Sequence, residues 1–127
     1  MFVQYPSFFR LARNSSLLSS HDRSKVGAVL VNKRPMVFGF NKFKSHTKYA
    51  NPSFHDKISV HAEIACLIES KDKNLEGWSI YVYREDCHGE VANSRPCDDC
   101  MVQLKKRGIK KIYYTTRVFP HWNMEYI

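Results

Sequence analysis

The sequence predicts an α/β protein in which helices pack on a mixed β-sheet. Short runs rich in β-branched and aromatic residues alternate with segments of helical spacing, in the order helix, strand, strand, helix, strand, helix, strand. Two segments with potential metal ligands each follow a loop and open a helix, and packing on one sheet would bring these helix starts together. With 127 residues the chain is long enough for one compact core, so we expect a single domain over residues 1–127.

The first half of the chain predicts a helix followed by a β-hairpin. Turn chemistry in the Asn-Lys-Arg-Pro segment separates two apolar, β-branched runs. The polar, basic segment before His61 contains Pro52 and predicts a long loop, which in a compact domain is usually functional or mobile. The expected elements are a helix from about Gln4 to Ser19, strands at 25–31 and 36–40, and a loop at 41–59.

The second half predicts two helices and two strands. Pro96 could occupy a first helical turn without losing a needed donor, and Gly108 is a good helix stop. The tail after residue 115 matches no element pattern that we could assign. The expected elements are a helix whose first turn carries His61 and Glu63, a strand at 78–83, a polar loop at 84–95, a helix from Pro96 to Gly108 and a strand at 109–115.

The positive charge is unevenly distributed along the chain. Residues 1–60 hold ten Lys and Arg against two Asp and Glu, whereas residues 61–127 hold ten of each. This asymmetry favours an anionic partner, such as a nucleotide phosphate or a nucleic-acid backbone, although a solvated basic face explains it equally well. No apolar stretch reaches the length of a membrane span, and the first residues lack the apolar region of a signal peptide. We therefore expect a cytoplasmic protein with no membrane partner.

Two short motifs, His61-Ala62-Glu63 and Pro96-Cys97-Asp98-Asp99-Cys100, predict a metal site. One imidazole and two thiolates are typical zinc ligands, and three protein ligands leave a fourth tetrahedral position open to water, as in a catalytic site. Cys97 and Cys100 are three residues apart at a helix start, so their sulfur atoms can share one ion. Glu63 is not needed as a metal ligand, and its carboxylate is placed to transfer protons. Cys66 and Cys87 are expected to be free thiols, with Cys66 in the core.

A closed structural zinc site is the alternative that these motifs leave open. It needs a fourth protein ligand. A structural site also has no use for Glu63, which disfavours it. The candidates for a fourth ligand could instead form a second metal site, which their separation in sequence disfavours. The candidates for a fourth ligand are His46, His55, Cys87 and His88.

The motifs resemble those of the cytidine and deoxycytidylate deaminase superfamily, zinc-dependent enzymes whose signature is His-x-Glu followed by Pro-Cys-x-x-Cys. The segment Asp22–Ala28 most resembles deoxycytidylate deaminases. The resemblance implies a three-layer α/β/α fold with a central mixed sheet of about five strands. It also implies hydrolysis of an exocyclic amine to a carbonyl. The matching stretches, in the order of the family, are Val26–Val31, Gly39–Asn41, His61–Glu63, Pro96–Cys100 and Lys110–Tyr114.

The resemblance also implies roles for individual residues. Zn²⁺ would bind His61, Cys97 and Cys100, and Glu63 would be catalytic. Asn41 matches an asparagine that hydrogen-bonds the nucleoside portion of the substrate. Ala62 would leave room beside the metal and turn its backbone N–H toward the base. Other candidates for substrate binding are Ser94, and with it Arg95, near the base edge, and Lys42 and His46 near a phosphate.

Three functions agree with these observations. The leading one is a zinc-dependent deaminase that converts a cytosine-type nucleotide, dCMP-like, to its uracil form with release of ammonia. The second is a polynucleotide deaminase acting on cytosine or adenine in single-stranded DNA or tRNA, because the net charge of +8 exceeds the need of one phosphate and aromatic residues interrupt the basic loop. The third is a zinc-stabilised nucleic-acid-binding module without activity. Relatives often assemble, so a homo-oligomer is a further expectation.

Overall fold

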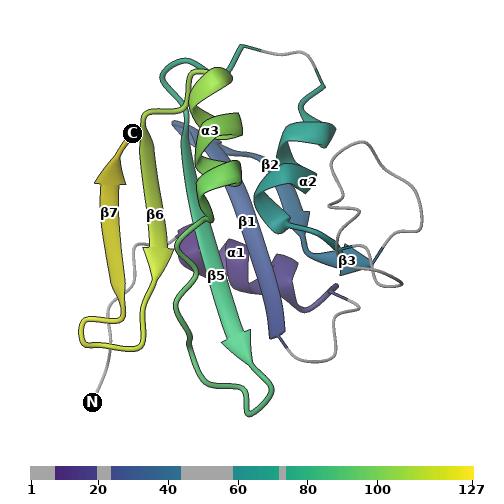
Figure 1. Ribbon diagram of the computed structural model, residues 1–127, viewed down its shortest axis with the longest axis vertical. Helices are drawn as coiled ribbons and strands as arrows, with labels where there is room; N and C mark the ends of the chain where they lie inside the picture. Colours follow the sequence, from purple (N-terminus) through teal and green to yellow (C-terminus); the bar gives the residue numbers. More distant parts are fainter. Residues whose placement is uncertain (1–7, 20–23, 44–58, 72–73) are drawn as a thin grey trace.

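A five-stranded mixed sheet forms the centre of the protein (Figure 1). The computed structural model describes residues 8–19, 24–43, 59–71 and 74–127. Its strands lie in the order β2-β1-β5-β6-β7, and a separate two-stranded ribbon pairs β3 with β4. The elements are α1 (Phe8–Ser16), β1 (Ser24–Asn32), β2 (Arg34–Phe40), β3 (Lys42–Phe43), β4 (Ser59–Val60), α2 (Ala62–Glu69), β5 (Ser79–Asp86), α3 (Asp98–Lys106), β6 (Lys111–Thr115) and β7 (Trp122–Tyr126).

The strand directions confirm the predicted mixed sheet. Strand β1 is antiparallel to both β2 and β5, so the expected hairpin is present. Strands β5 and β6 are parallel, and α3 makes the connection between them. Strand β7 returns antiparallel to β6 and closes the sheet at that edge.

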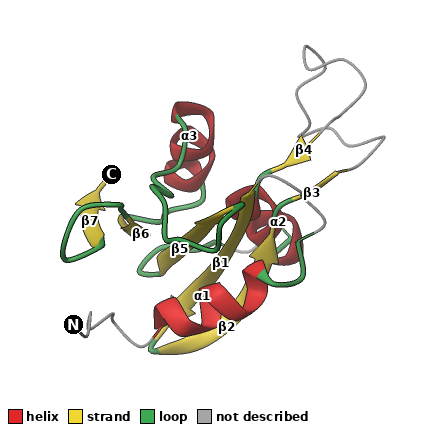
Figure 2. Ribbon diagram, turned by 90° about the horizontal axis from the view of Figure 1, so that it is seen from below, coloured by secondary structure: helices red, strands yellow, loops and turns green. Residues whose placement is uncertain are grey.

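Helices cover both faces of the sheet and make three layers (Figure 2). Alternate residues of a strand point to opposite faces, and this divides β5. Ile80 and Val82 join the buried cluster with α2 and α3, whereas Tyr81 and Tyr83 pack with α1 on the other side. The three-layer α/β/α architecture is therefore confirmed. Among the described residues, no helix has both the length and the apolar character needed to cross a bilayer.

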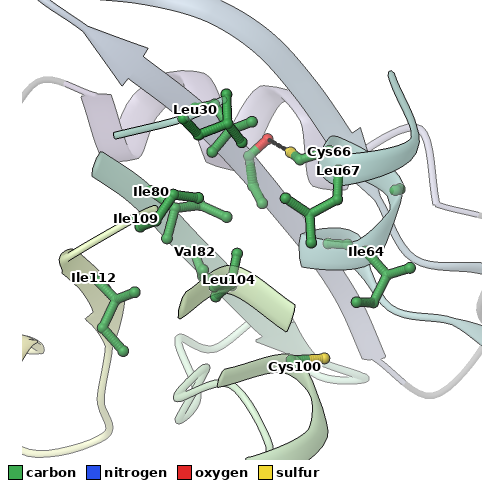
Figure 3. Close-up of a cluster of buried hydrophobic side chains, with 14 of the residues drawn as sticks. Leu30, Ile64, Cys66, Leu67, Ile80, Val82, Cys100, Leu104, Ile109 and Ile112 are labelled. Carbon is green, nitrogen blue, oxygen red and sulfur yellow. Dashed lines mark hydrogen bonds between the residues drawn. The ribbon is translucent and has the colours of Figure 1, made fainter. Parts of the chain in front are cut away.

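The cluster under α2 and α3 holds both helices in place (Figure 3). Leu67 of α2 and Leu104 of α3 are fully or almost fully buried against the sheet. Cys66 lies in the same cluster with its thiol 3.5 Å from the carbonyl oxygen of Ala28, as expected for a packed core cysteine. Each side chain of this size that leaves water contributes about 1.5–3 kcal/mol to folding.

Two glycines let the helices approach the sheet backbone closely. A Cβ atom on Gly39 of β2 would lie 2.6 Å from the carbonyl oxygen of Ala62 and 2.8 Å from the amide nitrogen of Cys66. On Gly27 of β1 it would lie 1.9 Å from the carbonyl oxygen of Ala12 in α1. These backbone atoms leave no room for a side chain, so the two glycines set the distances of α2 and α1 from the sheet.

Several element boundaries differ from the sequence-based expectation. Strand β5 continues to Asp86, because its polar end pairs with β1 from Ser24 onward. Helix α1 ends at Ser16, and Pro96 precedes α3 instead of occupying its first turn. The short strands β3 and β4 lie in the expected loop. The unassigned tail forms β7, where the alternation Trp-Asn-Met-Glu-Tyr matches the two-residue period of a strand.

Candidate active site

The two motifs lie at the N-termini of α2 and α3. His61 is the N-cap residue of α2 and Cys97 is the N-cap residue of α3, and both have extended backbone angles. In each case the backbone carbonyl accepts the first helical hydrogen bond, from Ala65 and from Met101 at 2.9 Å. Neither side chain caps its helix, although capping is the usual role of a residue in this position. Both side chains are therefore available to bind a ligand.

The helices bring His61, Cys97 and Cys100 together. Their ligand atoms all lie within 4.8 Å of one another. The imidazole Nδ1 is 3.3 Å from Sγ of Cys100 and 3.7 Å from Sγ of Cys97. In a tetrahedral zinc site, Zn–N and Zn–S bonds of ordinary length place nitrogen and sulfur about 3.6 Å apart. The three donors therefore fit Zn²⁺ in both their chemistry and their separation.

The thiol of Cys100 also requires a cation to become a ligand. Burial and the neighbouring carboxylate of Glu63 raise the pKa of Cys100 far above its ordinary value. A thiol must lose its proton to bind metal. Burial destabilises the resulting thiolate, and the charge of a divalent ion offsets this effect. Cys100 and Glu63 are both buried, so ionisation of both groups requires a neighbouring cation.

No fourth His, Cys, Asp or Glu ligand completes this cluster within the part of the chain that the structure describes. Cys87 is exposed at the turn after β5, and His88 lies in the same turn with its amide bound to Asp86. Neither belongs to the cluster. His46 and His55 lie outside the described residues. Three ligands with one open position are the arrangement of a catalytic zinc site.

Glu63 lies in the first turn of α2, two residues after His61. Its side chain is only 4% exposed. Burial raises the pKa of Glu63, while its electrostatic interaction with His61 and its hydrogen bonds to its own backbone and to Cys100 oppose this effect. A carboxyl group whose pKa is raised is a better proton acceptor than an ordinary carboxylate, which is the property that a general acid–base residue needs.

A cavity of about 240 Å³ opens beside these residues. Its lining joins the start of α2, the sheet and the loop before α3. The sequence motif therefore faces a space that a ligand can enter. The lining residues are Ser24, Val26, Asn41, His61, Ala62, Glu63, Arg84, Asn93, Ser94, Arg95 and Cys97.

Residues 3–116 match a family model described as the cytidine and deoxycytidylate deaminase zinc-binding region. The protein belongs to this family. Zinc is the cofactor of this family region, and the cluster of His61, Cys97 and Cys100 has the donors that it requires. A search of curated proteins found no match.

Solved structures of this deaminase family show the same fold. The dCMP deaminase of cyanophage S-TIM5 in apo form is 23% identical and superposes with a TM-score of 0.63, over 90% of this chain and 83% of that one. The same enzyme in complex with dCMP and dUMP is 22% identical, with a TM-score of 0.63 over 87% and 79% of the two chains. A cytidine deaminase from Burkholderia pseudomallei is 14% identical, with a TM-score of 0.66 over 97% and 92%. The TM-scores establish the shared fold. At these low identities, the substrate has to be inferred from the site itself.

In this deaminase domain, Asn41 joins two walls of the cavity. Its side chain is 5% exposed. The amide oxygen accepts a hydrogen bond from the backbone nitrogen of Val26 at 2.8 Å, and Nδ2 donates to the carbonyl oxygen of Ser24 at 3.1 Å. Asn41 therefore holds the start of β1 against the end of β2, and one Nδ2 hydrogen has no partner among the described residues and is available to a substrate.

The hydroxyl group of Ser94 is occupied by other parts of the protein. It donates to the carbonyl oxygen of Val82 at 2.7 Å and accepts from the amide of Thr115 at 2.7 Å. The hydroxyl of Thr115 lies 2.9 Å away and is fully buried. The backbone amide of Ser94 also donates to the carbonyl oxygen of Thr115 at 2.9 Å, so a hydrogen bond between a substrate and Ser94 would use its backbone carbonyl oxygen. Ala62 lines the cavity beside the metal ligands as expected, the side chain of Lys42 is not described, and His46 lies outside the described residues.

Two residues that shape this site were not predicted from the sequence. Glu125 of β7 binds the guanidinium of Arg95 at 2.6 and 3.3 Å and accepts a hydrogen bond from the hydroxyl of Tyr114. The tail thus anchors the residue that precedes Pro96 and Cys97. Arg84 lines the cavity from β5. The sequence signal for Arg84 was a single cation directly after the strand expected at 78–83, in a segment expected to be a loop.

Replacing Cys100 should test the metal cluster directly. We expect Cys100→Ser to lose most of its zinc, because a neutral hydroxyl replaces one of three ligands. Elemental analysis of the purified protein measures this, with Cys87→Ser as the matched control because Cys87 is exposed and outside the cluster. Equal zinc contents in the two variants would contradict the assignment of Cys100.

Proposed function

We propose that the protein is a zinc-dependent hydrolytic deaminase that converts a cytosine-type nucleotide, dCMP-like, to its uracil form with release of ammonia. The observation that carries the proposal is the convergence of His61, Cys97 and Cys100 beside a buried, spare Glu63 on one cavity. A closed structural site would need a fourth ligand and would gain nothing from this carboxyl group.

The residues divide the chemistry between binding and proton transfer. His61, Cys97 and Cys100 would hold the Zn²⁺, which when bound would lower the pKa of water to about 7. Glu63 takes a proton from the attacking water and delivers it to the ring nitrogen of the base. It then takes the second proton, from the hydroxyl group added to the base, and delivers it to the departing amine, so that a carbonyl forms and ammonia leaves. Such transfers typically contribute about 10²- to 10⁴-fold to the rate. Asn41 and the backbone at Ala62 orient the nucleoside in the cavity.

Similarity to known enzymes supports a nucleotide as the substrate. The cyanophage enzyme that shares this fold was solved with dCMP and dUMP, and the matched family includes deoxycytidylate deaminases. The expectations of a single domain, a cytoplasmic location and a homo-oligomer are part of the same proposal.

A polynucleotide deaminase is the second candidate. The net charge of +8 favours it, because the whole excess lies upstream of His61 and exceeds what one phosphate requires. A base in such a substrate must be unstacked before it can enter the cavity. The two candidates share the metal site and differ only in what the surrounding loops bind.

Ammonia release from a panel of substrates separates these candidates. The purified zinc-loaded protein should deaminate dCMP with a higher kcat/KM than deoxycytidine. The panel also includes dCTP and a cytosine-containing single-stranded oligonucleotide, each followed at two salt concentrations because multi-phosphate binding weakens steeply with salt. Turnover of the oligonucleotide alone would overturn the nucleotide assignment, and no turnover of any substrate would overturn the enzymatic proposal.

A further inference from the structure

The cavity contains a cation that the metal site does not use. Arg84 lies near the end of β5, opposite Val26 of β1. Ile80 and Val82 of the same strand face α2 and α3, so the two-residue period of a strand places Arg84 on the face that carries His61. Its side chain lines the cavity together with that of Val26.

The hydrogen bonds of Arg84 leave much of its guanidinium unsatisfied. Nη1 donates to the carbonyl oxygen of Asn93 at 3.2 Å. The Nε atom is buried and has no hydrogen-bond partner, and it is the only such buried side-chain donor or acceptor among the described residues. Buried polar groups are normally paired, so an unsatisfied donor beside a cavity indicates a partner that the chain itself does not provide.

The charge of Arg84 also lacks a counter-ion within the described parts of the chain. The carboxylates that follow it in sequence bind other arginines, Glu85 with Arg13 and Asp86 with Arg117, each at 3.1 Å. The other arginine of the cavity, Arg95, is paired with Glu125 at 2.6 Å. The side chain of Arg84 is half-buried, and its guanidinium differs from that of Arg95 in having no carboxylate partner among the described residues.

The chemistry of the missing partner follows from the guanidinium group. Its planar fork of donors suits the oxygen atoms of phosphate or carboxylate, and such charge-assisted hydrogen bonds are about twice as strong as neutral ones. Asn93 holds only one nitrogen of this fork. Arg84 lines the cavity together with Glu63 and is not one of the metal ligands, so its guanidinium is available to an anionic group that enters the cavity.

We propose that Arg84 binds a phosphate group of the substrate and thereby makes the site selective for a nucleotide over a nucleoside. The proposal rests on the proposed function, because the cavity is taken to hold the base beside the metal ligands. The phosphate is that of a free 5′-monophosphate or that of a polynucleotide backbone, and the two sources are separable by experiment.

Paired substrates with and without phosphate test this role. We would measure kcat/KM of the wild type, Arg84→Gln and Arg84→Lys for dCMP, deoxycytidine and a cytosine-containing oligonucleotide. Arg84→Gln should lower kcat/KM for dCMP by about 30- to 100-fold, as expected for loss of charge-assisted hydrogen bonds, and change the value for deoxycytidine by less than about 3-fold. Arg84→Lys should recover part of the loss. The matched control is Arg117→Gln, which removes the same charge outside the cavity lining.

Binding of the product provides a readout that does not depend on turnover. Calorimetry should show that the wild type binds dUMP at least about 10-fold more tightly than deoxyuridine, and that Arg84→Gln removes this difference. If the wild type deaminates nothing, the proposed function fails while this comparison still decides whether Arg84 binds phosphate.

Two results would overturn the assignment. A parallel loss with dCMP and deoxycytidine would mean that Arg84 only fixes the loop at Asn93, and unchanged values for both would mean that it has no role in binding. If kcat/KM falls only for the oligonucleotide, Arg84 binds a phosphate of the polynucleotide backbone and not that of a free nucleotide. Thermal unfolding of each variant shows whether it is folded. If Arg84→Gln does not fold, the same comparison is made with Arg84→Lys.

Discussion

Glu63→Gln should abolish deamination and leave the zinc content unchanged. The amide has almost the shape of the carboxyl group but cannot accept and return a proton, so kcat should fall by at least about 10²- to 10⁴-fold. Glu63 is nearly inaccessible, and its burial disfavours the charged form. A neutral replacement avoids that unfavourable burial, so we expect the free energy of unfolding to be unchanged or larger. Ammonia release, elemental analysis and chemical denaturation measure the three effects.

Glu69→Gln is the matched control for this experiment. Glu69 is the last residue of the same helix, α2, and its side chain is exposed. Its replacement removes one negative charge from the helix without reaching the cavity, so the activity should remain within about 2-fold of the wild type. Loss of zinc from Glu63→Gln would show instead that Glu63 is a ligand. Retained activity would exclude it as the proton-transfer residue.

The reactive part of the site was predictable from sequence because its residues are close together in two short motifs. Cys97 and Cys100 are three residues apart, and His61 and Glu63 are two residues apart. These spacings can be recognised whatever the fold is. Each pair occupies the start of one helix, so local geometry fixes the pair and the sheet only has to bring two helices together. The family resemblance added the order of the motifs along the chain.

The walls of the cavity were less predictable because they depend on contacts between distant segments. Ser94 lines the cavity and remains a candidate for substrate binding, but its hydroxyl is held by Val82 of β5 and Thr115 of β6. Arg84 gave no periodic signal, since a polar strand end resembles a loop in sequence. Strand β5 extends to Asp86 only because β1 continues beside it, and such pairing is not encoded locally.

The tail shows the same limitation for the fold. Its alternation of apolar and polar residues from Trp122 to Tyr126 is short. In the sequence, this segment is separated from β6 by a turn, although the two strands pair in the structure. The functional reason for its position appears only in three dimensions, where Glu125 holds Arg95 beside the second motif. A short strand of this kind becomes identifiable when its partner strand is known.

Gly39→Ala should disturb the active site through the backbone. The new Cβ would lie 2.6 Å from the carbonyl oxygen of Ala62, 2.8 Å from the amide nitrogen of Cys66 and 2.9 Å from its sulfur atom. Because two of these are backbone atoms, the start of α2 must move, and it carries both His61 and Glu63. We expect the free energy of unfolding to fall by about 1–3 kcal/mol, the range for overpacking. A displacement near 1 Å would lower kcat/KM by about 10²-fold.

Gly27→Ala separates this displacement from a general loss of stability. Its Cβ would collide with the backbone of α1, at 1.9 Å from the carbonyl oxygen of Ala12, on the face of the sheet opposite to the metal ligands. It should destabilise the protein at least as much as Gly39→Ala, yet the folded fraction should keep its zinc and a kcat/KM within about 3-fold of the wild type. Denaturation curves give the folded fraction to which each rate is normalised. If both variants lose activity equally after this correction, the contact at Gly39 does not set the position of His61 and Glu63.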